Sequence, residues 1–107
     1  MNEIHELVKE IEAFTEERNW SQFHTPANLA KSIAIEAAEL LECYQWSDEA
    51  DPQAVEEELA DVLNYCLQMT SVLGLDPAEI IRKKMKLNAI KYPVEKSKGR
   101  SDKYDRL

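Results

Sequence analysis

Four carboxylates stand in two pairs that share one spacing. Glu36 and Glu39 lie three residues apart, and Glu58 and Asp61 repeat that spacing after eighteen intervening residues. On a helix, side chains three residues apart are neighbours on one surface, so each pair can offer two carboxylates to one cation. Oxygen ligands without His or Cys favour Mg²⁺ or Mn²⁺ and disfavour zinc. The four acids are therefore candidate metal ligands.

The charge pattern around these acids allows two interpretations. No Lys or Arg occurs between Lys31 and Arg82, an interval that contains twelve Asp and Glu residues, and the chain is basic from Arg82 onward. Carboxylates that converge at the rim of a core repel one another in a partly desolvated site, and a divalent cation relieves that repulsion. An acidic solvated face followed by a basic tail would give the same pattern. From the residues alone, both interpretations stay open.

Apolar periodicity predicts four helices that would position the acids. The first spans roughly residues 2–18, and the second to fourth each begin where a cap residue precedes proline, a combination that favours helix initiation. These starts are Thr25-Pro26, Asp51-Pro52 and Asp76-Pro77. Gly74 marks the end of the third helix, and the fourth stops before Pro93. We expect the second and third helices to pack antiparallel, which gives an all-α fold, most simply a helical bundle.

Composition restricts the class of protein. At 107 residues the chain makes one domain of a size that commonly oligomerises to bury more surface. We expect a helical domain over residues 1–92 and a basic tail over residues 93–107 that could close over an active site. A net charge of -8 argues against binding nucleic acid, and no apolar run approaches the roughly 18 residues of a membrane span. The acidic, amphipathic N-terminus is unlike a signal peptide. Cys43 and Cys66 are expected to be reduced thiols in a cytoplasmic protein.

Glu36-x-x-Glu39 followed by Glu58-x-x-Asp61 resembles the metal-binding signature of the MazG-like, all-α nucleoside triphosphate pyrophosphohydrolases. Further blocks are similar, in order and spacing, to the dCTP pyrophosphatase branch of that family: RNWSQFHTPANL, ELLECYQW, EEELADVLNYC, KMKLNAIKYP and a late SDKY. The resemblance covers nearly the whole chain. It implies a four-to-five-helix MazG-like fold in which dimerisation completes a four-helix bundle, and tight dimers that often pair into tetramers.

The same resemblance implies a reaction. Relatives of this kind hydrolyse nucleoside triphosphates between the α- and β-phosphates, which gives a nucleoside monophosphate and pyrophosphate. It implies that Glu36, Glu39, Glu58 and Asp61 hold Mg²⁺, with Mn²⁺ as a substitute, against the triphosphate. Either Glu36 or Glu39 is a candidate general base. The substrate favoured is dCTP or a modified dCTP, and the role is the removal of unwanted nucleotides, known as house-cleaning.

Positions that match the family's motifs also supply candidate nucleotide-binding residues. Trp20 and Trp46 each end a motif at a helix–loop boundary, where a ring could stack on a base; packing in the core is the alternative for each. Ile11 and Ile35 depart from the family's pattern, so the base preference stays open. For the other candidates the alternatives are loop packing, core packing or exposure to solvent. These candidates are His24, Asn28, Tyr65, Lys84, Asn88, Lys91, Tyr92, Arg100, Lys103 and Tyr104.

Two other classes of protein are also consistent with the pattern of the four acids. One is a non-catalytic helical dimerisation module whose acidic, cation-binding patch recognises a basic partner. The other is a cation-binding regulator without turnover. Both would keep the carboxylates but need no pocket for a base, so the surroundings of Trp20 and Trp46 discriminate between these classes and the enzyme.

Overall fold

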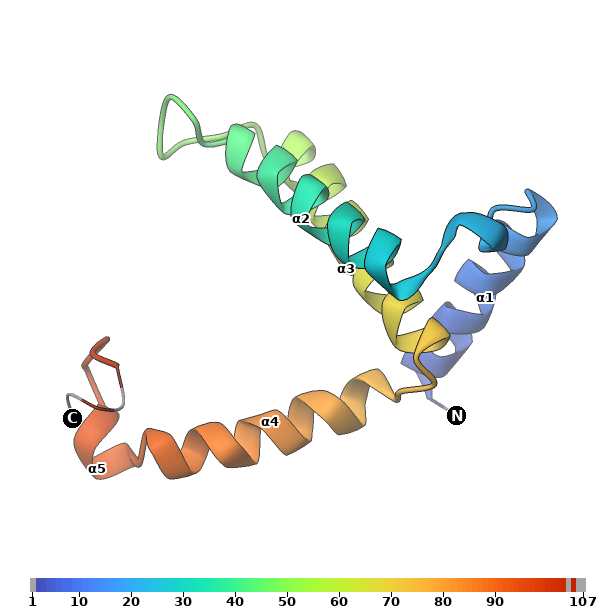
Figure 1. Cartoon of the computed structure of the whole chain (residues 1–107). Coiled ribbons are helices and arrows are strands. Elements are labelled where there is room, and N and C mark those ends of the chain that lie inside the picture. The colour runs from blue at the N-terminus through green and yellow to red at the C-terminus, as the bar shows by residue number, and fades with distance from the viewer. Residues whose placement is uncertain (1, 104, 106–107) are drawn as a thin grey trace. The chain divides into compact units, whose positions relative to one another are not determined.

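The computed structural model describes residues 2–103 and 105, and over these residues it is helical without strands. The elements are α1 (Glu3–Glu17), η1 (Ser21–Phe23, a 3₁₀ helix), α2 (Pro26–Glu42), α3 (Pro52–Val72), α4 (Pro77–Lys91) and α5 (Val94–Ser97) (Figure 1). The predicted all-α class is confirmed, as are the four long helices. η1 and α5 were not predicted. None of the described helices is both long enough and apolar enough to cross a lipid bilayer.

The chain forms two compact units, one that ends at Leu75 and one that begins at Asp76. The first contains α1, η1, α2 and α3, and the second contains α4 and α5. The expected domain over residues 1–92 and tail over residues 93–107 stay predictions.

The predicted helix starts are present as side-chain caps. In each case a Thr or Asp oxygen accepts a backbone N–H of the first turn, which otherwise lacks a partner. The bonds are Thr25 Oγ1 with Asn28 N at 3.1 Å, Asp51 Oδ1 with Gln53 N at 3.4 Å, and Asp76 Oδ1 with Glu79 N at 3.1 Å. The prolines follow at the first helical position, where no N–H is needed. Gly74, with φ of 68°, ends α3 as predicted.

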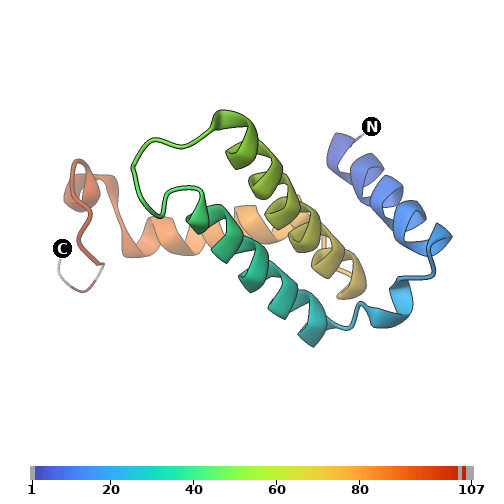
Figure 2. The same ribbon diagram turned by 90° about the horizontal axis from the view of Figure 1, so that it is seen from above.

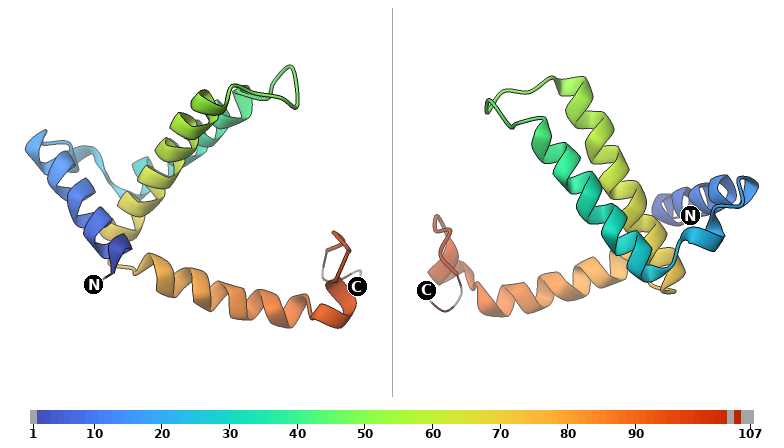
Figure 3. Two further views of the ribbon diagram at one scale, coloured as in Figure 1. Left: turned by 180° about the vertical axis from the view of Figure 1, so that it is seen from behind. Right: turned by 45° about the horizontal axis from the view of Figure 1, so that its top comes forward.

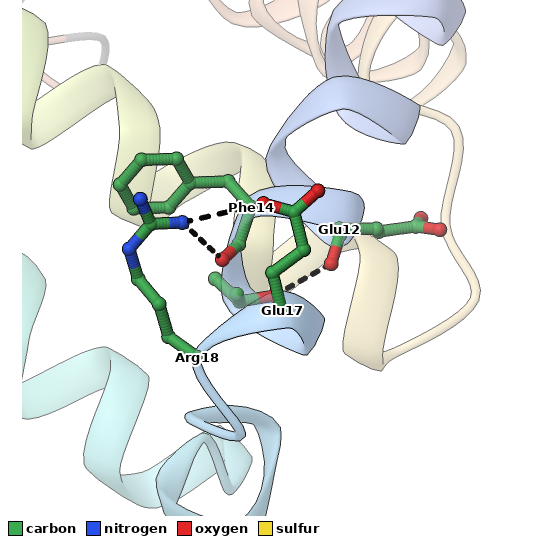
Figure 4. Close-up of polar contacts among 5 residues, drawn as sticks. Glu12, Phe14, Glu17 and Arg18 are labelled. Atoms are coloured by element: carbon green, nitrogen blue, oxygen red, sulfur yellow. Dashed lines mark hydrogen bonds and ion pairs between the residues drawn. The ribbon is translucent and has the colours of Figure 1, made fainter.

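The end of α1 directs the loop that carries Trp20. Asn19 adopts a left-handed conformation with φ of 56°, and the Trp20 N–H then donates to the Thr15 carbonyl over 2.9 Å, as in a Schellman helix end. Arg18 reaches back and donates through Nη1 to the Phe14 carbonyl over 2.9 Å (Figure 4). The Phe14 and Trp20 rings meet edge to face, with 5.9 Å between centroids. The loop is therefore held against α1.

In the first unit, α2 and α3 form the most extensive helix pair and run side by side in opposite directions (Figures 2 and 3). The N-terminal helix α1 also packs on α3. Leu29 of α2 is fully buried, whereas Ile35, Leu41 and Leu63 stay 59%, 69% and 56% exposed. The α2–α3 pair thus buries Leu29 and leaves apolar side chains of both helices uncovered. Its antiparallel arrangement is as predicted.

Candidate metal and nucleotide site

The α2–α3 pair brings three of the four predicted metal ligands together. Glu36 of α2 meets Glu58 and Asp61 of α3, and one carboxylate oxygen from each lies within 4.8 Å of the other two. Glu58 and Asp61 are neighbours because three residues make nearly one helical turn, and the antiparallel pairing supplies Glu36 from the opposite helix. Glu39 lies one turn further along α2 and is exposed.

Two of these carboxylates are poorly solvated. Glu36 and Glu58 are partly buried, and the Oε2 atom of each is enclosed without a hydrogen-bond donor. Burial raises the pKa of Glu36, and a hydrogen bond to Glu39 and the charges of Glu39, Asp61 and Glu58 raise it further. The pKa of Glu58 is raised for the same reasons: burial first, then a hydrogen bond to Glu39 and the charges of Glu39, Asp61 and Glu57. The cluster therefore disfavours its own ionised state.

A divalent cation fits this arrangement. The donors are all carboxylate oxygens, the ligand type that Mg²⁺ and Mn²⁺ prefer. Enclosed oxygens without donors are unfavourable in a folded protein, and a bound cation would coordinate them. It would also replace the mutual repulsion of the carboxylates by attraction. Glu36, Glu58 and Asp61 are the residues that could hold it, with Glu39 beside them.

We expect the metal-free protein to lose stability as the pH rises above about 4.5. The ordinary pKa of a Glu side chain is 4.5, whereas the folded protein raises the pKa values of Glu36 and Glu58 above it. Between the ordinary and the raised values, the folded state binds more protons than the unfolded state, so the free energy of unfolding falls with increasing pH in that window. Urea unfolding in EDTA, followed from about pH 5 to about pH 8, measures the decline.

The control for this measurement is the double variant Glu36→Gln, Glu58→Gln. Amides do not titrate, so its free energy of unfolding should decline less over the same window. Equal declines in both proteins above the ordinary carboxyl pKa would contradict the raised pKa values.

A cavity of about 300 Å³ lies between α1, the following loop and the C-terminal half of α3. It brings together three of the predicted nucleotide-binding residues, Trp20, His24 and Tyr65. Ile11, which departs from the family's pattern, also lines it, together with Phe14 and Gln68. Trp20 is 45% exposed, so its ring is accessible and is not filling a core. The cavity combines aromatic walls with polar groups, as small-molecule sites do.

Two predicted residues in this unit have other surroundings. Trp46 is 89% exposed in the connection between α2 and α3. The Asn28 side chain donates through Nδ2 to the Phe23 carbonyl over 2.9 Å, and this bond fastens η1 to the start of α2. Their predicted contacts with the nucleotide stay predictions.

The remaining candidates belong to the second unit. Lys84, Asn88 and Lys91 lie on α4, and Tyr92 caps its C-terminal end. Arg100 Nη2 donates to Asp102 Oδ2 over 2.8 Å, and Lys103 is exposed. Tyr104 lies outside the described residues. The predicted contacts of all these residues with the nucleotide stay predictions.

Sequence reasoning overlooked two polar residues of α3, Asn64 and Gln68, which both line the cavity. Gln68 is only 8% exposed, and its Nε2 donates to Asn64 Oδ1 over 3.1 Å. A signal was present in the sequence. Gln68 follows Asp61 by seven residues, or two helical turns, and so lies on the same face of α3.

Comparison with known proteins identifies relatives. Residues 31–107, which contain all four acids, match the model of the MazG-like family. Proteins named dCTP pyrophosphatase 1 from Rattus norvegicus and Homo sapiens are 36% and 34% identical in alignments 104 residues long, which cover 88% of this chain and 61% of each relative. The chain thus spans about three fifths of the length of these mammalian proteins. A solved structure of a pyrophosphatase from Archaeoglobus fulgidus has a TM-score of 0.79 and 41% identity, covering 87% of this chain and 94% of that one.

Proposed function

The chain belongs to the MazG-like family, and we propose that it is a Mg²⁺-dependent pyrophosphohydrolase of nucleoside triphosphates. The observation that carries the proposal is the cluster of Glu36, Glu58 and Asp61. One oxygen of each lies within 4.8 Å of the others, and both Glu36 and Glu58 have an enclosed oxygen without a donor. Relatives named as pyrophosphatases support this class of reaction. The products would be a nucleoside monophosphate and pyrophosphate.

The proposed mechanism assigns different roles to the acids. Glu36, Glu58 and Asp61 would hold the cation, and Mn²⁺ would suit the same donors. When bound, the ion would supply positive charge that offsets the triphosphate and the leaving pyrophosphate. Glu39 is the general base, because it is exposed to water beside the partly buried Glu36. The water oxygen bonds to the α-phosphorus, its proton passes to a Glu39 carboxylate oxygen, and the bond from the α-phosphorus to the bridging oxygen breaks.

We assign the base to the cavity lined by Trp20, His24 and Tyr65. Its volume of about 300 Å³ lies within the range of small-molecule sites, and the accessible Trp20 ring can stack on a planar base. The names of the mammalian relatives favour dCTP, or a modified dCTP, as the substrate. The cellular role proposed is house-cleaning of the nucleotide pool.

We also propose that the protein acts as a homo-oligomer, either a dimer or a dimer of dimers. The supporting observation is the uncovered apolar surface of α2 and α3, where Ile35, Leu41 and Leu63 remain more than half exposed. A second α2–α3 pair would bury this surface and complete a four-helix bundle. The two free cysteines favour the cytoplasm as the compartment.

Analysis of the products tests the proposed reaction. Incubation with the canonical deoxynucleoside and ribonucleoside triphosphates in Mg²⁺, followed by ³¹P NMR, should show pyrophosphate and a nucleoside monophosphate. We expect dCTP to give the highest kcat/KM of the set. Release of orthophosphate with a nucleoside diphosphate would contradict cleavage between the α- and β-phosphates. A different best substrate would contradict the base preference and leave the reaction class intact.

A further inference from the structure

We propose that Gln68, held by Asn64, reads the edge of the nucleobase and selects a base that carries an exocyclic amino group. This inference rests on the proposed function only in taking the bound molecule to be a nucleotide. It adds a specificity-determining residue that neither the metal cluster nor the aromatic walls of the cavity supply.

The first observation is an unsatisfied acceptor. Gln68 is 8% exposed, and its Oε1 atom is buried without a hydrogen-bond donor. An amide oxygen in that state is unfavourable because it has lost water without gaining a partner. Buried polar groups of this kind are few in native proteins and commonly have a functional cause. An N–H group from a ligand would supply the missing donor.

The second observation is that the Gln68 amide is fixed in orientation. Its Nε2 donates to Asn64 Oδ1 over 3.1 Å, one helical turn away. One N–H of the amide is held by Asn64, and this bond fixes the plane of the amide and the direction of its carbonyl oxygen, the acceptor that lacks a donor. An acceptor that is oriented before binding loses little entropy when the bond forms. Asn64 therefore acts as a positioning residue for Gln68.

The third observation is the location of the pair. Gln68 and Asn64 border the same cavity as Trp20 and Tyr65, so an edge contact and a stacking surface are available to one planar ligand. Seven residues separate Gln68 from Asp61, which corresponds to roughly 10 Å along α3. A nucleotide with its phosphates at the acidic cluster can reach this far with its base. One face of α3 thus serves both ends of the substrate.

The chemistry of the free acceptor favours one class of base. Cytosine carries an amino group at C4, which can donate to Gln68 Oε1. Uracil and thymine carry a carbonyl at the same position, so two acceptors would face each other and both would stay unpaired. A site built on a hydrogen bond discriminates strongly against an analogue that cannot make it. We therefore assign to Gln68 the preference for cytosine over uracil.

Binding of dCMP and dUMP, measured by isothermal titration calorimetry in Mg²⁺, tests this inference without depending on hydrolysis. Wild-type protein should bind dCMP roughly tenfold more tightly than dUMP, about the worth of one satisfied hydrogen bond in a buried site. Gln68→Met keeps the size and length of the side chain but removes the acceptor, and it should bring the ratio of the two affinities close to one. Gln53→Met, the same change at an exposed position of α3, should keep the wild-type ratio.

Other outcomes separate the possible roles. If wild-type protein binds the two nucleotides equally or binds neither, or if Gln68→Met keeps the wild-type ratio, the inference is overturned. A purely structural role predicts a lower melting temperature for Gln68→Met with no change in the ratio; our inference predicts a ligand-free melting temperature at least as high as that of the wild type. Failure of the proposed reaction would look different. If the ratio of the dCMP and dUMP affinities depends on Gln68 but no triphosphate is hydrolysed, the proposed reaction is refuted and the role of Gln68 in base selection is supported.

Discussion

The Glu58→Gln variant is expected to lose on the order of a thousandfold in kcat/KM for triphosphate hydrolysis, as electrostatic groups at reaction centres do when they are removed. Glu58 belongs to the cluster with Glu36 and Asp61. The amide has nearly the same shape as the carboxylate but no charge for the cation. Initial rates of pyrophosphate release over a range of substrate and Mg²⁺ concentrations measure the loss.

We expect Glu58→Gln to lose activity without losing stability. In the wild type, Glu58 has an enclosed oxygen without a donor and a raised pKa, so its ionised form is unfavourable in the metal-free fold. Glu58→Gln should therefore be at least as stable as the wild type in EDTA at neutral pH. The matched control is Glu56→Gln, an exposed position two residues earlier, which should keep wild-type turnover. Loss of the helical circular dichroism signal in Glu58→Gln would instead indicate a structural role for the side chain.

Mg²⁺ is expected to raise the melting temperature of the wild-type protein by on the order of 10 °C at neutral pH. A ligand that binds only the folded state at a hundred times its Kd adds about 2.7 kcal/mol, and for a domain near this size each kcal/mol moves the midpoint by about 4–8 °C. Burial and then the neighbouring carboxylates raise the pKa of Glu36, and a bound cation would offset the repulsion among these carboxylates. Differential scanning calorimetry at one fixed protein concentration, with Mg²⁺ and with EDTA, measures the shift.

The comparison that decides the origin of this stabilisation uses two variants of α2. Glu36→Gln removes a member of the cluster and should abolish most of the Mg²⁺-dependent shift. Glu42→Gln changes an exposed acid six residues nearer the C-terminal end of α2 and should retain the shift. Similar shifts in both variants would mean that Mg²⁺ acts on the acidic surface in general, and the assignment of the cluster as the metal site would be wrong.

The helices could be predicted because their signals are local. Thr25, Asp51 and Asp76 each precede a proline, and each accepts a hydrogen bond from the first turn of its helix. The 3₁₀ helix η1 and the short α5 carry no apolar stripe, since they are only three and four residues long. Periodicity therefore could not reveal them.

The site could be predicted in part. The spacing of Glu58 and Asp61 makes them neighbours on any helix, but which acids of α2 they meet depends on how the two helices are aligned along their lengths. That alignment is a property of tertiary packing, and it places Glu36 within the cluster and leaves Glu39 exposed beside it. From the spacing in the sequence alone, Glu36 and Glu39 are equally good candidates for the cluster.

The burial of Gln68 could not be predicted from the sequence. Gln68 is a polar residue that is usually exposed, and it becomes buried here because α1 packs over the C-terminal half of α3. The different surroundings of the two tryptophans could not be predicted from the sequence either. Both end a motif at a helix–loop boundary, yet Trp20 borders the cavity while Trp46 is 89% exposed. Non-local packing decides both outcomes.

The most direct test of the central claim is pyrophosphate release by the wild-type protein from a panel of canonical and modified nucleoside triphosphates, measured in parallel with Mg²⁺ and with EDTA. The acidic cluster of Glu36, Glu58 and Asp61 predicts release from at least one triphosphate, with dCTP among the best, and its loss in EDTA. Activity should return when Mg²⁺ is restored in excess. Absence of metal-dependent release from every triphosphate of the panel would contradict the account.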